Sequence, residues 1–200
     1  MAKLLPSIKS KTVLVLMVKY ILIAAFVILF FAVTPAQDKI ASTEFEHAVK
    51  LYEEQKYDDA LLIFFFLLNY LKQIASIQPS VVFKAKILIT KNKFYESEKL
   101  LKDFLKSSPE EQYIDEARLT LAKNLYEQTF YYPAFKELIV LLLETKSGSY
   151  KKDAELYTEA IALNHIDPVQ VKPVADSSNT KIKPFLLLLT GKMYLSQNRP

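Results

Sequence analysis

The chain has 200 residues, of which 51% are hydrophobic, and its 26 Lys and Arg against 22 Asp and Glu give a formal net charge of +4. It contains no cysteine and only two glycines. Disulfides, thiolate metal sites and a cysteine nucleophile are therefore excluded, and so is a glycine-rich phosphate loop. The only histidines, His47 and His165, have no partners at metal-ligand spacing, so we expect no metal, no cofactor and no catalytic activity.

The positive charge is concentrated at the N-terminus. Residues 1–36 contain four lysines and no acidic residue, and these lysines equal the whole excess of basic over acidic residues. The rest of the chain is therefore neutral. Nothing in its charge pattern predicts nucleic-acid binding.

Residues 1–36 also contain an apolar run. The segment from Tyr20 to Val33, followed by the small residue Ala36, is typical of a signal peptide. Counted from Val13, the run has 21 residues and is long enough for an uncleaved signal anchor, in which case residues 13–33 would contact the membrane. Both alternatives predict that the rest of the chain lies in the periplasm or otherwise outside the cytoplasm, in the second case anchored to the inner membrane.

An aromatic, a small and a large apolar residue recur three times at fixed offsets, and successive sets lie 37 residues apart. The sets are Tyr57, Ala60 and Phe64, then Phe94, Ser97 and Leu101, then Tyr131, Ala134 and Leu138. Each set follows a segment with helical periodicity and lies in the first turns of another. A constant period of this size indicates one helical hairpin that is repeated and stacked. We therefore expect three hairpins over residues 42–146.

Small residues also mark the first helix of each hairpin. Ala48, Ala85 and Ala122 lie twelve residues before Ala60, Ser97 and Ala134. We expect these residues to face each other where the paired helices cross, because a larger side chain there would push the axes apart. The residues two positions before the aromatic residue of each set are Gln55, Asn92 and Thr129. They lie where a helix commonly ends in a left-handed conformation. Pro109 is typical of the connection that follows the second hairpin.

A second apolar run, residues 61–71, falls on the second helix of the first hairpin. At 11 residues it is too short to cross a bilayer. Because that helix has neighbours in the stack, we expect the run to be buried.

The 37-residue rhythm breaks after residue 146. Lys151 to Asn164 is typical of one amphipathic helix, and Asp167 with Pro168 of an N-cap followed by proline in the first turn of a short helix. We interpret residues 151–180 as a diverged helical unit with a linker, the alternative being an interdomain linker. Residues 181–200 are interpreted as the first helix of a truncated further hairpin, with Gly191 at the small position and Tyr194 at the aromatic one.

The arrangement resembles the tetratricopeptide repeat (TPR) family over about residues 42–146, and again over residues 181–200. It departs from the family pattern because the chain has no tryptophan and because the second small position carries Leu67, Phe104 and Leu141. The resemblance implies an all-α fold, a right-handed solenoid of helical hairpins, here preceded by an N-terminal signal or anchor helix. It also implies that the first helices line a concave groove, which holds a peptide or a segment of another protein.

Transferred by position, the resemblance selects Tyr52, Lys86, Lys123, Tyr126 and Lys192 as groove residues. The three lysines occupy one equivalent position. They would make a basic track suited to acidic side chains or to a C-terminal carboxylate. The alternative is a solvated helix face that happens to carry lysine.

The implied function is protein or peptide binding by a non-catalytic scaffold in the bacterial cell envelope, similar to outer-membrane assembly proteins of the BamD type. The lack of cysteine argues against a lipoprotein version. One alternative is the N-terminal module of a longer protein that resembles penicillin-binding-protein activators with a periplasmic-binding fold. Another is the sensor region of a membrane enzyme.

Overall fold

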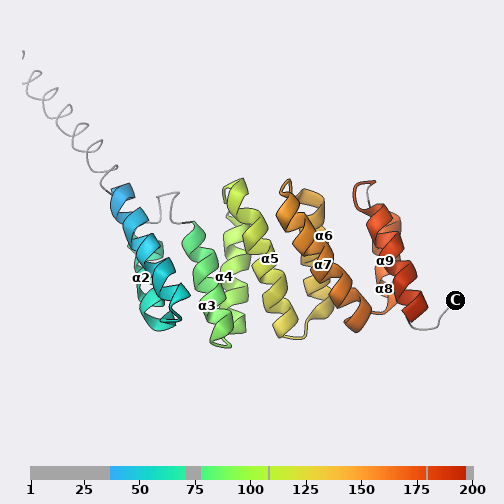
Figure 1. The fold of residues 1–200 in the computed structure, drawn as a ribbon, viewed down its shortest axis with the longest axis horizontal. Coiled ribbons are helices and arrows are strands. Elements are labelled where there is room, and N and C mark those ends of the chain that lie inside the picture. Colours follow the sequence, from blue (N-terminus) through green and yellow to red (C-terminus); the bar gives the residue numbers. More distant parts are fainter. Residues whose placement is uncertain (1–36, 71–77, 108, 179, 197–200) are drawn as a thin grey trace, which may run out of the picture.

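A computed structural model describes residues 37–70, 78–107, 109–178 and 180–196, and this part of the chain is all-α (Figure 1). The expected signal or anchor segment, residues 1–36, lies outside the described residues. Within those residues no helix is both long enough and apolar enough to cross a bilayer.

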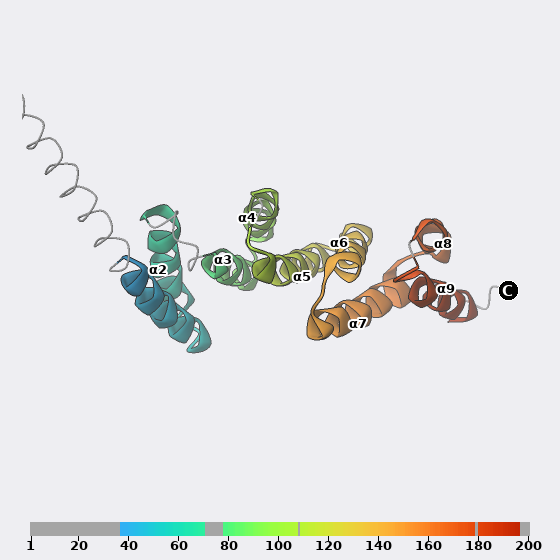
Figure 2. The ribbon, with the colours of Figure 1, turned by 90° about the horizontal axis from the view of Figure 1, so that it is seen from above.

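The helices follow each other along one axis in two rows, as in a solenoid (Figures 1 and 2). The first row contains helix 37–53, α3 (Pro79–Thr90), α5 (Glu111–Glu127), α7 (Gly148–His165) and α9 (Lys183–Ser196). The second row contains α2 (Tyr57–Tyr70), α4 (Phe94–Lys106), α6 (Tyr131–Glu144) and α8 (Pro168–Ser177). From α3 onward, each helix of the first row also packs on the next member of that row.

The turns of the first three hairpins have one shared backbone structure. Gln55, Asn92 and Thr129 have φ values of 59°, 58° and 62°, as the sequence predicts. In each turn the N–H of this residue donates to the carbonyl three residues earlier, at 2.8–3.0 Å, and the next N–H donates to the carbonyl five residues earlier, at 2.8–2.9 Å. This is the Schellman motif, which satisfies the last carbonyls of a helix while it reverses the chain.

The small residues lie buried where the paired helices cross. Ala48, Ala60, Ala85, Ser97 and Ala134 are fully buried, and Ala122 is 2% exposed. The Ser97 hydroxyl donates to the Ala85 carbonyl at 3.0 Å, so a second-helix side chain touches first-helix backbone. The other repeated positions divide by burial: Phe64, Leu101 and Leu138 are buried, and Tyr57, Phe94 and Tyr131 are half-buried.

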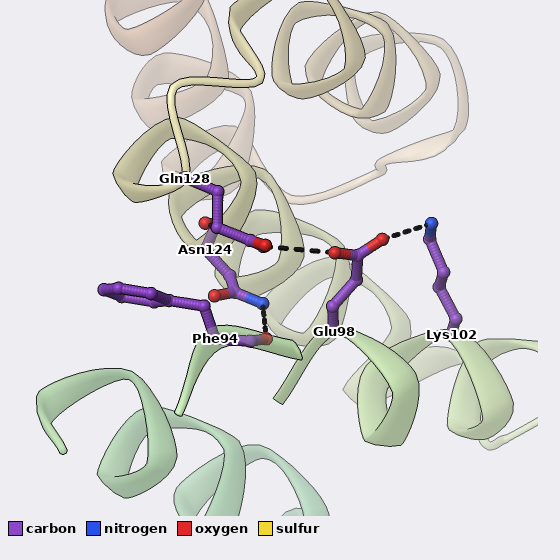
Figure 3. A network of polar contacts seen from close by, with 5 residues as sticks. All are labelled: Phe94, Glu98, Lys102, Asn124 and Gln128. Carbon is purple, nitrogen blue, oxygen red and sulfur yellow. Dashed lines mark hydrogen bonds and ion pairs between the residues drawn. The ribbon is translucent and has the colours of Figure 1, made fainter. Parts of the chain in front are cut away.

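Polar contacts join successive hairpins (Figure 3). The Asn124 side chain on α5 donates to the Phe94 carbonyl on α4 at 3.0 Å. Just past the end of α5, the Gln128 amide donates to Glu98 at 3.1 Å, and Glu98 also accepts from Lys102 at 2.6 Å. These contacts fix the rotation of α5 against the preceding hairpin.

The C-terminal helices are arranged differently. Helix α7 packs mainly on α6 and α9, whereas α8 packs on α9. Asp167 accepts the Val169 N–H at 2.9 Å and Pro168 opens α8, which confirms the predicted cap. Gly191 is exposed, and a Cβ there would meet nothing within 4 Å, so no helix crosses α9 at this position in the described residues. Tyr194 is half-buried, and Pro109 lies in the connection between α4 and α5.

The expectation that the apolar run at 61–71 is buried was wrong for part of the run. Phe64 and Leu67 are fully buried, but Leu62 is 69% exposed, Phe65 55% and Phe66 43%. The cause is geometric, because α2 lies in the second row and contacts helix 37–53 and α3 from one side only. A helix that is apolar all round then leaves one apolar face in solvent.

Candidate binding groove

A hollow of about 620 Å³ lies along the first row of helices, within the range of about 300–1,000 Å³ common for ligand pockets. Most of its wall comes from α3, α5 and α7. The lining residues are Tyr52, Lys86, Ile89, Glu116, Leu119, Thr120, Ala122, Lys123, Tyr126, Glu127, Leu138, Tyr150, Tyr157, Ala160, Ile161 and Asn164.

The repeat brings one position of each first helix to this hollow. Tyr52, Ile89 and Tyr126 lie 37 residues apart and each accepts the N–H of the left-handed turn residue. The turn therefore fixes where these side chains lie. Tyr52 packs against Tyr57 with ring centroids 5.7 Å apart, and Tyr126 contacts Tyr131 at 5.4 Å.

Helix α7 supplies the remaining tyrosines. Tyr150 and Tyr157 both line the hollow, and the Lys123 ammonium lies 4.7 Å from the centre of the Tyr157 ring. Burial, aided by the Glu116 and Asp115 carboxylates, raises the pKa of Tyr150. Like any tyrosine hydroxyl it is protonated at neutral pH and can donate a hydrogen bond, and the raised pKa extends this to higher pH.

The lysines of the expected basic track have different surroundings. Lys86 donates to Glu116 at 2.6 Å and lies over the Phe83 ring. Lys192 lies outside the hollow and is paired with Glu159 at 2.6 Å. Lys86 is therefore compensated by the next helix of the first row and Lys192 by the preceding one, which leaves Lys123, of these three lysines, as the one that faces the hollow over an aromatic ring.

His165, to which the sequence analysis assigned no role, lies beside Tyr126 and Tyr131. It lies at the C-terminus of α7, stacked on Tyr131 with centroids 3.8 Å apart and an interplanar angle of 8°. The Tyr126 hydroxyl lies 3.5 Å from His165 Nε2. In the described residues no cluster of three or more His, Asp or Glu could hold a metal ion.

Sequence reasoning selected Tyr52, Lys86, Lys123 and Tyr126, which the structure brings together in one hollow. It missed the α7 side of the wall, because the 37-residue period breaks before Tyr150 and Tyr157. Amphipathic periodicity over residues 151–164 was the available signal, but it does not say which face meets α5.

Comparison with protein-family models, with curated proteins and with solved structures finds no match to this chain. The likeness to TPR proteins therefore rests on the period, the crossing residues and the turns described above.

Proposed function

We propose that the chain is a non-catalytic, TPR-type scaffold that binds a peptide or an extended segment of another protein along its first row of helices. The observation that carries this proposal is the hollow lined by Tyr52, Tyr126, Tyr150 and Tyr157. Tyrosine gives large contact area at a low cost in side-chain entropy and keeps a hydroxyl for hydrogen bonding. The expected location outside the cytoplasm rests on the sequence of residues 1–36, and its assignment to the cell envelope on the resemblance to envelope TPR proteins.

The charges in the hollow suit a particular kind of peptide. Lys86 and Glu116 compensate each other, so one cation, Lys123, and one acid, Glu127, remain along a wall that is otherwise uncharged and mostly apolar or aromatic. In a mostly apolar segment, a single acidic side chain could pair with the Lys123 ammonium without breaking an existing ion pair. The expected specificity is for shape and aromatic contact, with charge as an orienting element.

A random peptide library displayed on phage, selected on the full chain, tests the binding. We expect selected peptides to lose affinity about tenfold or more in Tyr126→Ala and in Tyr157→Ala, as for aromatic hot spots. Tyr95→Ala is the matched control, because Tyr95 is 75% exposed on α4, away from the hollow. Fluorescence anisotropy measures each affinity, and circular dichroism verifies that each variant is folded.

The proposal fails if no peptide is enriched, or if the enriched peptides bind the Tyr126, Tyr157 and Tyr95 variants equally well. Lys123→Glu separates the role of charge. This variant should lower the affinity for acidic peptides most. Lys86→Glu is unsuitable for the same purpose, because it would place two carboxylates together.

A further inference from the structure

A second hollow, of about 360 Å³, lies next to the first along the same row of helices. Its lining residues in the described chain belong to α7 and α9. Helix α7 lies between α5 and α9 in this row and contacts both (Figure 2). Two adjacent exposed residues of α7 line different hollows, Tyr157 the first and Leu156 the second. The two hollows therefore lie on either side of one exposed edge of α7.

The second hollow offers apolar contact. Leu189 in its wall is buried and Phe185 is half-buried. Leu156 on α7 and Leu188 on α9 are 66% and 63% exposed, so they present apolar surface from both walls. Among its described lining residues none carries a hydroxyl or an amide side chain. An apolar side chain is therefore the group that this hollow suits.

The charges of the second hollow compensate each other. Its charged lining residues are two lysines and two glutamates, so it has no net charge. Glu159 on α7 and Lys192 on α9 are paired at 2.6 Å and join the two walls, and Glu155 lies 3.9 Å from Lys151. The first hollow differs, because it adds tyrosine hydroxyls and Lys123 to its apolar surface.

The packing of the helices sets the distance between the two hollows. The axes of packed helices lie about 8–10 Å apart, so the step from the α5–α7 side of α7 to its α9 side is about the same. An extended chain spans about 3.3–3.6 Å per residue, so about three residues cover this step. One extended segment can therefore place a side chain in each hollow.

We propose that a single extended segment of a partner protein occupies both hollows. One anchor, aromatic or acidic, lies among the tyrosines of the first hollow, and an aliphatic or phenylalanine anchor about three to five residues away lies between Leu156 and Leu188. This inference rests on the proposed function, because it assigns a second anchor to the same bound segment. The two are separable by experiment, since no described residue lines both hollows.

The test uses peptides selected on the full chain, each synthesised in its original form and with its apolar anchor replaced by alanine. The chain variants are Leu156→Ala and Leu188→Ala, one from each wall. Leu187→Ala is the matched control, because Leu187 is 48% exposed on the same helix as Leu188 but does not line the second hollow. Fluorescence anisotropy measures each affinity, and circular dichroism verifies that each variant is folded.

We expect the original peptide to lose affinity about fivefold in Leu156→Ala and in Leu188→Ala, and to keep it in Leu187→Ala. The peptide with the alanine anchor should bind the original chain about fivefold more weakly. It should show no further loss in Leu188→Ala, because the contact that this variant removes is already absent. Such non-additivity identifies the anchor and Leu188 as partners.

Peptides that depend on Tyr126 but keep their affinity in both leucine variants would overturn this inference and leave the proposed function intact. If no peptide depends on the tyrosines, the proposed function and this inference fail together. Equal losses in Leu187→Ala and Leu188→Ala would also overturn the inference, because the hollow would not be their cause. So would sedimentation of the original chain as a dimer that Leu188→Ala dissociates, since a second copy would then fill the second hollow.

Discussion

The first three hairpins and the α7–α8 junction reverse the chain in different ways. In the hairpins a single residue with positive φ ends the first helix, and the second helix folds back onto it. At the junction Ile166 has φ −123° and ψ 142°, and Asp167 caps α8 from an extended conformation. Helix α8 then packs on α9, while α7 packs mainly on α6 and α9.

The difference shows that the conformation of one backbone residue determines how two consecutive helices are arranged. A left-handed residue tightens the turn through two hydrogen bonds and so brings two helix faces together. An extended residue followed by an N-cap starts the next helix without that constraint. In the three hairpins, the small crossing residues and the left-handed turn occur together.

The largest expected effect concerns those crossing positions. Ala85→Leu should lower the free energy of unfolding by about 1–3 kcal/mol, because Ala85 is fully buried against the Ser97 side of α4. Gly191→Leu, at the equivalent position of α9, should raise it by about 0.5–1 kcal/mol, since glycine is a poor helix residue and the added side chain meets open space. Urea unfolding followed by circular dichroism measures both.

The two variants should change the free energy of unfolding in opposite directions, and this contrast is what the experiment tests. If Gly191→Leu destabilises as much as Ala85→Leu, then a helix does cross α9 at that position in solution. If neither variant differs from the original chain, close packing at the crossing is not what stabilises the hairpins.

A smaller effect is expected at the turn itself. Thr129 is β-branched and has φ 62°, a region that costs about 1–2 kcal/mol for residues other than glycine. Thr129→Gly should therefore raise the free energy of unfolding by about 0.5–1 kcal/mol after the entropic cost of glycine. Asn92→Gly should raise the free energy of unfolding by less, because asparagine tolerates this conformation.

Thr90→Gly is the matched control for the turn. Thr90 lies in the last turn of α3, where its hydroxyl donates to the Lys86 carbonyl at 3.1 Å. The same exchange should destabilise there, because the backbone is helical and no strain is relieved. A loss of stability in both threonine variants would show that the left-handed turn stores no strain.

The sequence predicted the repeated part of the fold well, for a physical reason. Periodicity, turn conformation and small crossing residues are local properties, so Gln55 and Asn92 identified their turns without knowledge of neighbours. The start and end of α7, at Gly148 and His165, differ from the expected 151–164 by a few residues, as is usual for helix ends.

Properties that depend on neighbouring hairpins were harder to predict. The pairing of Lys86 with Glu116 requires the rotation of α5 against α3, which no local pattern contains. The exposure of Phe65 depends on which row α2 joins and how many neighbours it has there. His165 contacts Tyr131 because α7 ends beside that residue, and the position of this helix end depends on the irregular α7–α8 junction.

The smallest expected effect tests the link between hairpins that the α7–α8 junction lacks. In two of the left-handed turns the residue before the turn residue reaches the second helix of the preceding hairpin, through Lys91 to Asp58 and through Gln128 to Glu98. The equivalent residue at the junction is Ile166, which is buried and apolar. A hydrogen bond from Lys102, aided by the Gln128 amide and opposed by partial burial, lowers the pKa of Glu98 below its usual 4.5.

Because the pKa of Glu98 is lower in the folded chain, its contribution is complete above pH 4.5 and is lost as the pH falls through the folded pKa. Glu98→Gln should therefore cost about 0.2–1 kcal/mol at neutral pH, as partly exposed pairs do, and should reduce the loss of stability on acidification. Urea unfolding over a series of pH values measures this slope. Glu96→Gln, two residues away and paired with Lys93 at 3.4 Å, is the control. Identical slopes for the two variants would mean that the Gln128–Glu98 contact does not join the hairpins energetically, and that the regular turns differ from the junction in backbone conformation alone.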